Sequence, residues 1–192
     1  GKTTTLRMIA GLEEVTSGEI SIGDKVVNDV APAKRGVAMV FQSYALYPQM
    51  TVRGNLSFGL KNAKVPQDEI DKRVARAAEI LQMENLLDRK PAALSGGQRQ
   101  RVALARALAP EPRVLLFDEP YANLDVPFRR ALREDARQII RQTDSIGLLV
   151  THDPDEVLTV ADHVVVLDNG GIVEAGAPQG LFDAPRSSYG AE

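Results

Sequence analysis

The chain has 192 residues, of which 44% are hydrophobic and 26% charged, with a formal net charge of -3 and no cysteine. A chain of this length is most simply one domain, able to bury roughly 70% of the surface that its unfolded form exposes. The absence of cysteine excludes a disulfide framework and a thiolate metal site, and the slight acidity gives no general attraction to nucleic acid. No apolar run approaches the length needed to span a bilayer, and no targeting segment is visible.

The first residues, Gly1-Lys2-Thr3-Thr4, match the end of the phosphate-loop pattern G-x-x-x-x-G-K-[ST]. Because the sequence starts inside this pattern and without Met, we expect its true N-terminus and the first strands of the sheet to be missing. Leu6, Ile9 and Ala10 share one face of the helix that follows, and Gly11 is expected to end it. Taken alone, Gly-Lys-Thr fits an ordinary helix start with an exposed lysine equally well.

A buried strand and an apolar loop come next. Residues 18–27 predict a hairpin, and the continuously apolar run Val37 to Phe41 predicts a buried parallel strand. This strand delivers Gln42 to its C-terminal end, the edge at which ligands gather in open α/β sheets. The segment Ser43 to Val52 carries two Tyr, a Leu and a Met before a helix expected to begin near Thr51. Such apolar groups suggest a docking surface, although packing beneath the helical part also explains them.

Two helices are predicted in the middle of the chain. Apolar residues recur at helical spacing between residues 65 and 89, at Ile70, Val74, Ala77, Ala78 and Leu81. After Leu94-Ser95-Gly96-Gly97-Gln98, a second periodic run extends through Ala109, with Ser95 as the expected N-cap. The free amides and partial positive charge of such a helix end suit a phosphate oxygen, which the two glycines allow to approach. An anion site and an ordinary capped helix remain equally good explanations of these five residues by themselves.

The apolar strand Val114 to Phe117 ends in the paired carboxylates Asp118-Glu119, whose charge at the edge of a buried strand requires a cationic partner. A helix is expected over residues 127–142. A further apolar strand over residues 146–150 is followed by His152, and Asp153 is expected to cap the next helix. Residues 164–174 predict a second hairpin around Asn169-Gly170-Gly171.

Together, the order and spacing of these motifs resemble the ATP-binding subunit of an ABC transporter, over nearly all of the chain. The segment from Ser43 to Val52, with Asn55 to Lys61 after it, is most similar to importers of maltose and other sugars, although Gln49 departs from the His often found there. The resemblance implies an α/β, RecA-like P-loop NTPase fold, and the chain is interpreted as one incomplete nucleotide-binding domain. Its expected parts are a mostly parallel core (1–43 and 111–175), a helical subdomain with the signature motif (44–110) and a tail (176–192).

The resemblance also implies roles for individual residues, with ATP and Mg²⁺ as cofactors. The expected nucleotide-binding residues are Gly1, Lys2, Thr3, Thr4, Ser95, Gly96, Gly97, Gln98 and Asp125. The expected metal contacts are Thr3, Gln42 and Asp118, and the expected catalytic residues are Glu119, His152 and Gln42. Glu119 is interpreted as the general base for the attacking water, and His152 as the switch residue that contacts the γ-phosphate.

The partners follow from the same resemblance. Two copies are expected to share each ATP, because the signature of one subunit binds the nucleotide held by the other. Permease subunits are expected to dock near Tyr44 to Val52, a substrate-binding protein acts indirectly, and no nucleic acid is involved. The subunit is thus expected to be peripheral at the cytoplasmic face of the cell membrane and to drive import of a solute. Carbohydrate is the preferred substrate, with ferric iron or polyamine as alternatives.

Three other interpretations remain open at this point. A P-loop kinase also carries Gly-Lys-Thr, but it gives no reason for the signature pentapeptide or for His152. A soluble ABC-type ATPase that acts on DNA or the ribosome shares the nucleotide motifs, and it normally carries a tandem domain or a long insertion. Finally, residues 1–192 alone are expected to bind ATP weakly or not at all and to be inactive, because half of the phosphate loop and the aromatic adenine platform precede Gly1 in the family.

Overall fold

The computed structural model describes residues 1–41, 45–121 and 126–183 of the chain. These residues pack into two units, one formed by residues 1–35 with residues from 149 onward, and the other by Gly36–Leu148. Among the residues described, no helix has both the length and the apolar character needed to cross a membrane. The phosphate-loop residues therefore belong to one unit, and the signature and paired carboxylates to the other.

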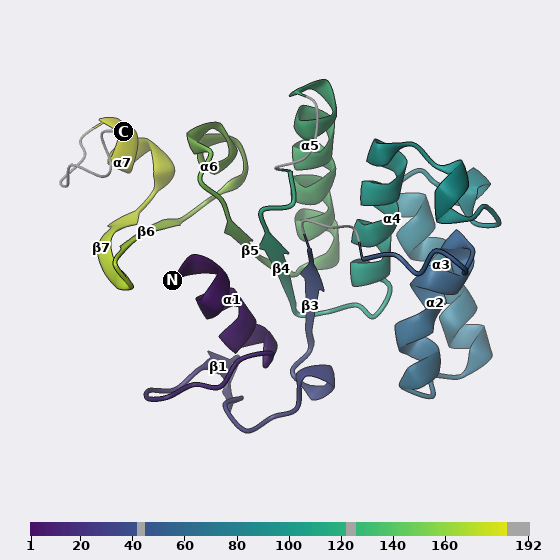
Figure 1. Ribbon diagram of the computed structural model, residues 1–192, viewed down its shortest axis with the longest axis horizontal. Coiled ribbons are helices and arrows are strands. Elements are labelled where there is room, and N and C mark those ends of the chain that lie inside the picture. Colours follow the sequence, from purple (N-terminus) through teal and green to yellow (C-terminus); the bar gives the residue numbers. More distant parts are fainter. Residues whose placement is uncertain (42–44, 122–125, 184–192) are drawn as a thin grey trace. The chain divides into compact units, whose positions relative to one another are not determined.

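The first unit begins with helix α1 (Lys2–Ala10), shown in purple in Figure 1. Leu6 and Ala10 are buried on its inner face, and Gly11 ends it in the left-handed conformation, with φ of 79°. This agrees with the predicted end of the helix, since glycine adopts positive φ without a steric penalty. The hairpin predicted next is formed by β1 (Ser21–Ile22) and β2 (Lys25–Val26), which pair antiparallel.

The rest of this unit comes from the C-terminal part of the chain. Helix α6 (Pro154–Val160) starts from Asp153, whose carboxylate accepts a hydrogen bond from the backbone N–H of Asp155 at 2.9 Å, as the sequence predicts. The predicted second hairpin is antiparallel as expected, formed by β6 (Val164–Asp168) and β7 (Gly171–Gly176). A short helix that the sequence did not predict, α7 (Pro178–Asp183), lies in the expected tail.

A sheet has the strand order β3 (Val37–Val40), β4 (Val114–Asp118) and β5 (Ile146–Val150) (Figure 1). Strands β3 and β4 and residues 146–148 of β5 belong to the second unit. Strands β3 and β4 run parallel. The central strand β4 buries its first four residues, whereas β3 is mostly half-buried, less than its apolar sequence predicts. At the start of β5, Ile146 is 67% exposed. Burial is thus greatest in the strand that ends in the two carboxylates.

Helices of the second unit pack on one another and on this sheet. They are α2 (Val52–Asn62), α3 (Gln67–Ile80), α4 (Gly96–Leu108) and α5 (Val126–Thr143), with short 3-10 turns at Glu84–Leu86 and Pro91–Ala93. Helices α2, α3 and α4 contact one another, and α4 also contacts β3 and α5. All of the predicted helices and strands are thereby present. The predicted boundary between a core and a helical subdomain at residues 44–110 stays a prediction.

Candidate functional site

The signature segment forms the first turn of α4, with Ser95 as its N-cap. The Ser95 hydroxyl accepts a hydrogen bond from the Gln98 backbone N–H at 3.2 Å, and the Gln98 side chain accepts one from the Ser95 N–H at 2.9 Å. This reciprocal capping box fixes the loop as it enters the helix. Between the two capping residues, Gly96 and Gly97 carry no side chain over the positive end of a helix of 13 residues. The predicted cap is confirmed, in a form suited to bring backbone amides close to an anion.

The paired carboxylates lie at the end of β4. Asp118 is the last residue of the strand, and Glu119 follows it with a left-handed backbone, at φ of 45°. Both side chains are half-buried. Positive φ is uncommon for a residue other than glycine, and such backbone strain is concentrated at functional sites. The strand thus leads into two consecutive acidic residues, the second of which leaves the extended conformation.

One residue that fixes this turn, Gln100, was not predicted from the sequence. Gln100 of α4 is 2% exposed, and its side-chain amide donates a hydrogen bond to the Pro120 carbonyl at 2.7 Å. The backbone after Glu119 is therefore tied to the helix that starts with the signature. A polar residue on the buried face of an amphipathic helix is the sequence signal that could have identified Gln100, because buried polar groups require partners.

In the other unit, the phosphate-loop residues start α1. Gly1 is the N-cap residue, and the first turn, residues 2–4, is exposed at the positive end of the helix. The Lys2 ammonium donates a hydrogen bond to the backbone carbonyl of Thr151 at 3.1 Å. Because Thr151 directly precedes His152, the structure brings the phosphate-loop lysine next to the segment that carries the predicted switch histidine.

The His152 side chain is exposed on a segment that is held on both sides. The Thr151 hydroxyl accepts a hydrogen bond from the Asp153 N–H at 3.0 Å and donates one to the carboxylate of Glu156. Glu156 is only 4% exposed. From the sequence, Glu156 is expected only to be favourable in the first turn of the helix, and Thr151 has no predicted role. Their hydrogen bonds fix the backbone on both sides of His152.

Two predicted site residues, Gln42 and Asp125, lie outside the described residues, as do Ser43 and Tyr44 of the expected docking segment. In the parts that are described, no group of three or more His, Asp or Glu side chains could hold a metal ion by itself. The remaining metal candidates, the Thr3 hydroxyl and the Asp118 carboxylate, are oxygen donors. This set fits Mg²⁺, which uses one or two protein oxygens and otherwise keeps water and phosphate oxygens.

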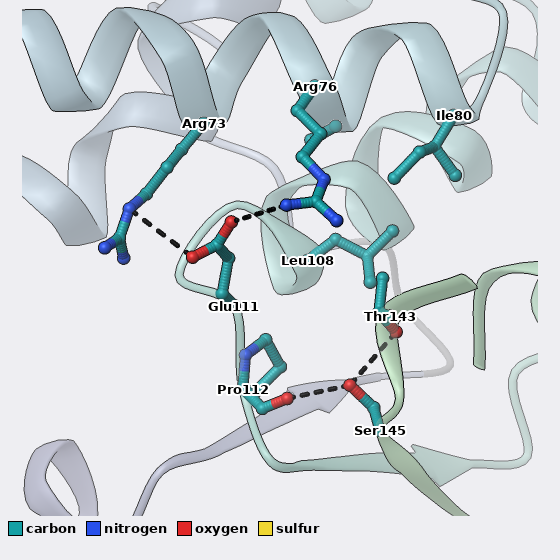
Figure 2. Close-up of a pocket in the computed structure, with 9 residues that line it drawn as sticks. Arg73, Arg76, Ile80, Leu108, Glu111, Pro112, Thr143 and Ser145 are labelled. Carbon is teal, nitrogen blue, oxygen red and sulfur yellow. Dashed lines mark hydrogen bonds and ion pairs between the residues drawn. The ribbon is translucent and has the colours of Figure 1, made fainter. Parts of the chain in front are cut away.

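Figure 2 shows a separate pocket of about 220 Å³ between α3 and the loop that leads into β4. Its polar groups already bind one another. The carboxylate of Glu111 lies 3.8 Å from Arg73 and 3.4 Å from Arg76. On the opposite wall, the Ser145 hydroxyl donates to the Pro112 carbonyl at 2.8 Å. None of the predicted site residues that the structure describes lines this pocket. We interpret it as a packing gap between secondary-structure elements.

These features define a nucleotide-binding α/β domain in which a phosphate-loop helix, a strand ending in two carboxylates and a capped glycine-rich helix occur on one chain. The protein-family model for the ABC transporter matches residues 1–122. The chain belongs to the ABC transporter family. The resemblance and the P-loop NTPase fold predicted from the sequence are both confirmed.

Individual relatives agree with this assignment. The chain is 54% identical over 189 residues to the sn-glycerol-3-phosphate import ATP-binding protein UgpC of Brucella abortus (strain 2308), which covers 98% of this chain and 54% of that protein. It is 52% identical over 189 residues to the maltose/maltodextrin import ATP-binding protein MalK of Mannheimia succiniciproducens, covering 98% of this chain and 51% of the relative. The chain thus spans about half the length of these curated relatives.

A solved structure is also similar. The structure of cbiO1 from Clostridium perfringens, described as part of the ABC transporter complex cbiONQ, superposes with a TM-score of 0.85 at 31% identity. The match covers 96% of this chain and 75% of that one. Similarity in three dimensions therefore extends well beyond the residues that the family model matches.

Proposed function

We propose that the full-length protein is the ATPase subunit of a solute importer, and that it hydrolyses ATP to drive import. One contact carries the proposal: the Lys2 ammonium at the start of α1 lies 3.1 Å from the Thr151 carbonyl, next to His152. A cation on a phosphate-loop helix is thereby held beside the backbone segment that carries an exposed histidine, within one unit. This is the arrangement that a terminal phosphate needs, and the relatives named as import ATP-binding proteins support the same conclusion.

The proposal assigns each side chain a task in phosphoryl transfer to water. Lys2 and the backbone amides at the start of α1 would bind the outer phosphates, and Thr4 the inner phosphate. Thr3, Gln42 and Asp118 would hold Mg²⁺, which neutralises phosphate charge when bound. Glu119 would accept the proton of the attacking water, and His152 would contact the γ-phosphate and orient it. Positioning and charge stabilisation supply most of the catalysis in reactions of this class.

A second copy of the subunit completes the proposed site. The capping box of Ser95 and Gln98 and the two glycines between them would present amides to the γ-phosphate held by the partner subunit. Asp125 would contact the partner in the dimer. ATP then joins the two subunits, and hydrolysis releases them, because the group that bridged them is lost.

The proposed location is the cytoplasmic face of the cell membrane, where the segment Tyr44 to Val52 docks on permease subunits and a substrate-binding protein acts indirectly. Tyr47 and Leu46, in the described part of this segment, are half-buried and leave apolar surface accessible. The named relatives import sn-glycerol-3-phosphate and maltose or maltodextrin, so a small polyhydroxylated solute, most simply a carbohydrate or its phosphate, is the proposed substrate.

The proposal is tested with the full-length protein by measuring ATP hydrolysis and ATP binding in parallel. Glu119→Gln should lower hydrolysis by roughly 10² to 10⁴-fold while ATP binding is retained, because only the general base is removed. Glu79→Gln, which neutralises an exposed glutamate of α3, is the matched control and should keep the parent rate. Hydrolysis by Glu119→Gln at the parent rate would overturn the role given to Glu119, and a parent protein that binds no ATP would overturn the proposed function.

A further inference from the structure

The segment that precedes α2, residues 45–51, is termed here the docking loop. Its second half is anchored to α2 by one side chain, Asn55, which is fully buried. The Asn55 carbonyl oxygen accepts a hydrogen bond from the Tyr47 N–H at 2.8 Å, and its amide donates to the carbonyls of Tyr47 and Thr51 at 3.1 and 3.0 Å. The Tyr47 ring also packs on Phe58 of α2, with the ring centroids 4.6 Å apart. This end of the docking loop is therefore fixed.

The first half of the docking loop is held differently, by the signature helix α4. Ala45 has a left-handed backbone, with φ of 47°. Such a conformation is strained for a residue with a side chain and persists only where the surroundings hold it. The guanidinium of Arg106, in the last turn of α4, donates a hydrogen bond to the Ala45 carbonyl. The same guanidinium carbon lies 5.8 Å from the centroid of the Tyr47 ring, within the range of a cation–π contact.

Arg106 is an arginine without a carboxylate partner among the described residues, although five other arginines pair with acidic groups there. Burial lowers the pKa of its guanidinium, and only Tyr47 opposes this change. A guanidinium remains charged even so. A half-buried guanidinium that binds one carbonyl and one aromatic face is held less strongly than a guanidinium in an ion pair. Movement of the loop can therefore release it.

Arg106 and the signature are parts of one rigid element. Residues 95 and 106 are separated by roughly 16 Å along α4 at the rise of an α-helix. A displacement of Ala45 by a docked partner therefore acts on α4 at one end, and the capping box of Ser95 and Gln98 lies at the other. Both contacts of Arg106 are with the loop on which a permease is proposed to dock.

We infer that Arg106 is a positioning residue that transmits the state of the docking loop to the signature, through its contacts with the Ala45 carbonyl and the Tyr47 ring. The inference rests on the proposed function, because it assumes a permease that docks on residues 45–51. It assigns Arg106 no contact with ATP. Its loss should uncouple the permease from hydrolysis rather than abolish the chemistry.

The test compares the ATPase rate of the full-length subunit in complex with its copurifying permease to the rate of the isolated subunit. Arg106→Met keeps the apolar stem and removes the donors, so the ratio of the two rates should fall about fivefold or more, as expected for loss of a coupling free energy. Arg106→Lys should recover part of the ratio, since an ammonium can still donate to the Ala45 carbonyl. Arg101→Met is the control on the same helix, because Arg101 pairs with Asp135 at 2.9 Å and has no contact with the loop.

A ratio that stays at the parent value in Arg106→Met overturns the inference, and so does a parallel fall of both rates, which indicates a merely structural role. If Arg106→Met does not fold, Tyr47→Leu removes the ring contact instead and should lower the ratio by a smaller factor. An unchanged ratio in that variant is equally decisive against the inference. Failure of the proposed function is distinguishable, because the unmodified subunit would then show no ATPase or no response to its permease.

Discussion

Two arginines, the buried Arg35 and the half-buried Arg106, show how differently the same side chain is used in this molecule. Arg35, in the phosphate-loop unit, is 7% exposed and donates to four backbone carbonyls, at 2.7 to 3.1 Å. Two of these carbonyls, of Met8 and Ile9, belong to the last turn of α1, where a cation complements the helix dipole. Arg106, in the signature unit, donates to one carbonyl and lies over one ring.

The contacts of Arg35 hold several backbone segments rigidly, whereas the contacts of Arg106 can be released. A guanidinium that uses most of its five donors on backbone groups holds several segments in one geometry, and any displacement breaks several bonds at once. One that binds a single carbonyl of a strained residue loses little when that residue moves. Arg35 thus fixes the helix that carries Lys2 and Thr3, whereas Arg106 leaves the docking loop adjustable.

Removal of the Arg35 guanidinium should have the largest effect on stability. Arg35→Met leaves four carbonyls without their donor, and we expect the free energy of unfolding of the full-length protein to fall by about 3 to 5 kcal/mol, the range for breaking a buried charged network. Urea denaturation measures it. Arg7→Met is the control, because Arg7 is half-exposed and its pair with Glu13 spans 3.6 Å, so it should cost less than about 1 kcal/mol. Equal losses in the two variants would contradict the comparison.

The packing of Arg35 can also be disturbed by a substitution at Gly11, which lies against its guanidinium. A Cβ at Gly11 would lie 2.6 Å from the Arg35 Nε, and the residue has φ of 79°. Gly11→Ala should therefore cost about 2 to 3 kcal/mol, from the left-handed backbone together with displacement of Arg35. Gly18→Ala isolates the backbone part, since Gly18 has φ of 83° and open space around it. The difference between their unfolding midpoints reports the Arg35 contact, and no difference would argue that Arg35 moves freely.

Removal of the Arg106 guanidinium should change stability less. Arg106→Met loses one hydrogen bond and one cation–π contact and relieves a desolvated charge, so we expect a cost of about 1 kcal/mol or less. The urea titrations used for Arg35 measure both variants under the same conditions. If Arg106→Met lowers the free energy of unfolding as much as Arg35→Met does, Arg106 too holds its surroundings rigidly, which would contradict the comparison.

A third arginine, Arg101, pairs with the carboxylate of Asp135. This pair is expected to give the smallest effect, a dependence of the protein's stability on pH. Burial raises the pKa of Asp135, and the charge and hydrogen bond of Arg101 only partly oppose it. A raised carboxyl pKa favours folding while the group is protonated, and this contribution is lost as the pH rises through the folded pKa. The free energy of unfolding of the parent minus that of Asp135→Asn should thus fall as the pH rises above the unfolded pKa of about 3.9. A rise instead would contradict the direction of the shift.

Features set by near neighbours could be predicted from the sequence. The Ser95 cap, the Asp153 cap and the strand that ends at Asp118 each depend on residues a few positions apart, and each is present in the structure. The shared site of Gln42 and Asp125 stays a prediction, because these residues lie outside the described ranges.

The contacts of Arg35 and Arg106 could not be predicted, because their partners are distant in sequence. Arg106 and Ala45 are 61 positions apart, and Arg35 and Met8 are 27 apart. A charged or amide side chain looks like surface until the fold supplies its partners. The left-handed backbone of Glu119 was hidden for a related reason, since no glycine marks this position and the backbone of the next residue is bound by the distant Gln100.

The proposal that two copies share each ATP is tested most directly by counting trapped nucleotide in tandem-linked dimers of the full-length protein. Both halves carry Glu119→Gln to prevent release by hydrolysis, and Lys2→Ala and Gly97→Asp are placed either on the same half or on opposite halves. If Lys2 of one subunit and Gly97 of the other bind the same ATP, opposite placement leaves one intact site and traps one ATP, whereas placement on one half damages both sites and traps none. The reverse result, one ATP with both changes on the same half and none with them apart, would show that each subunit builds its site alone.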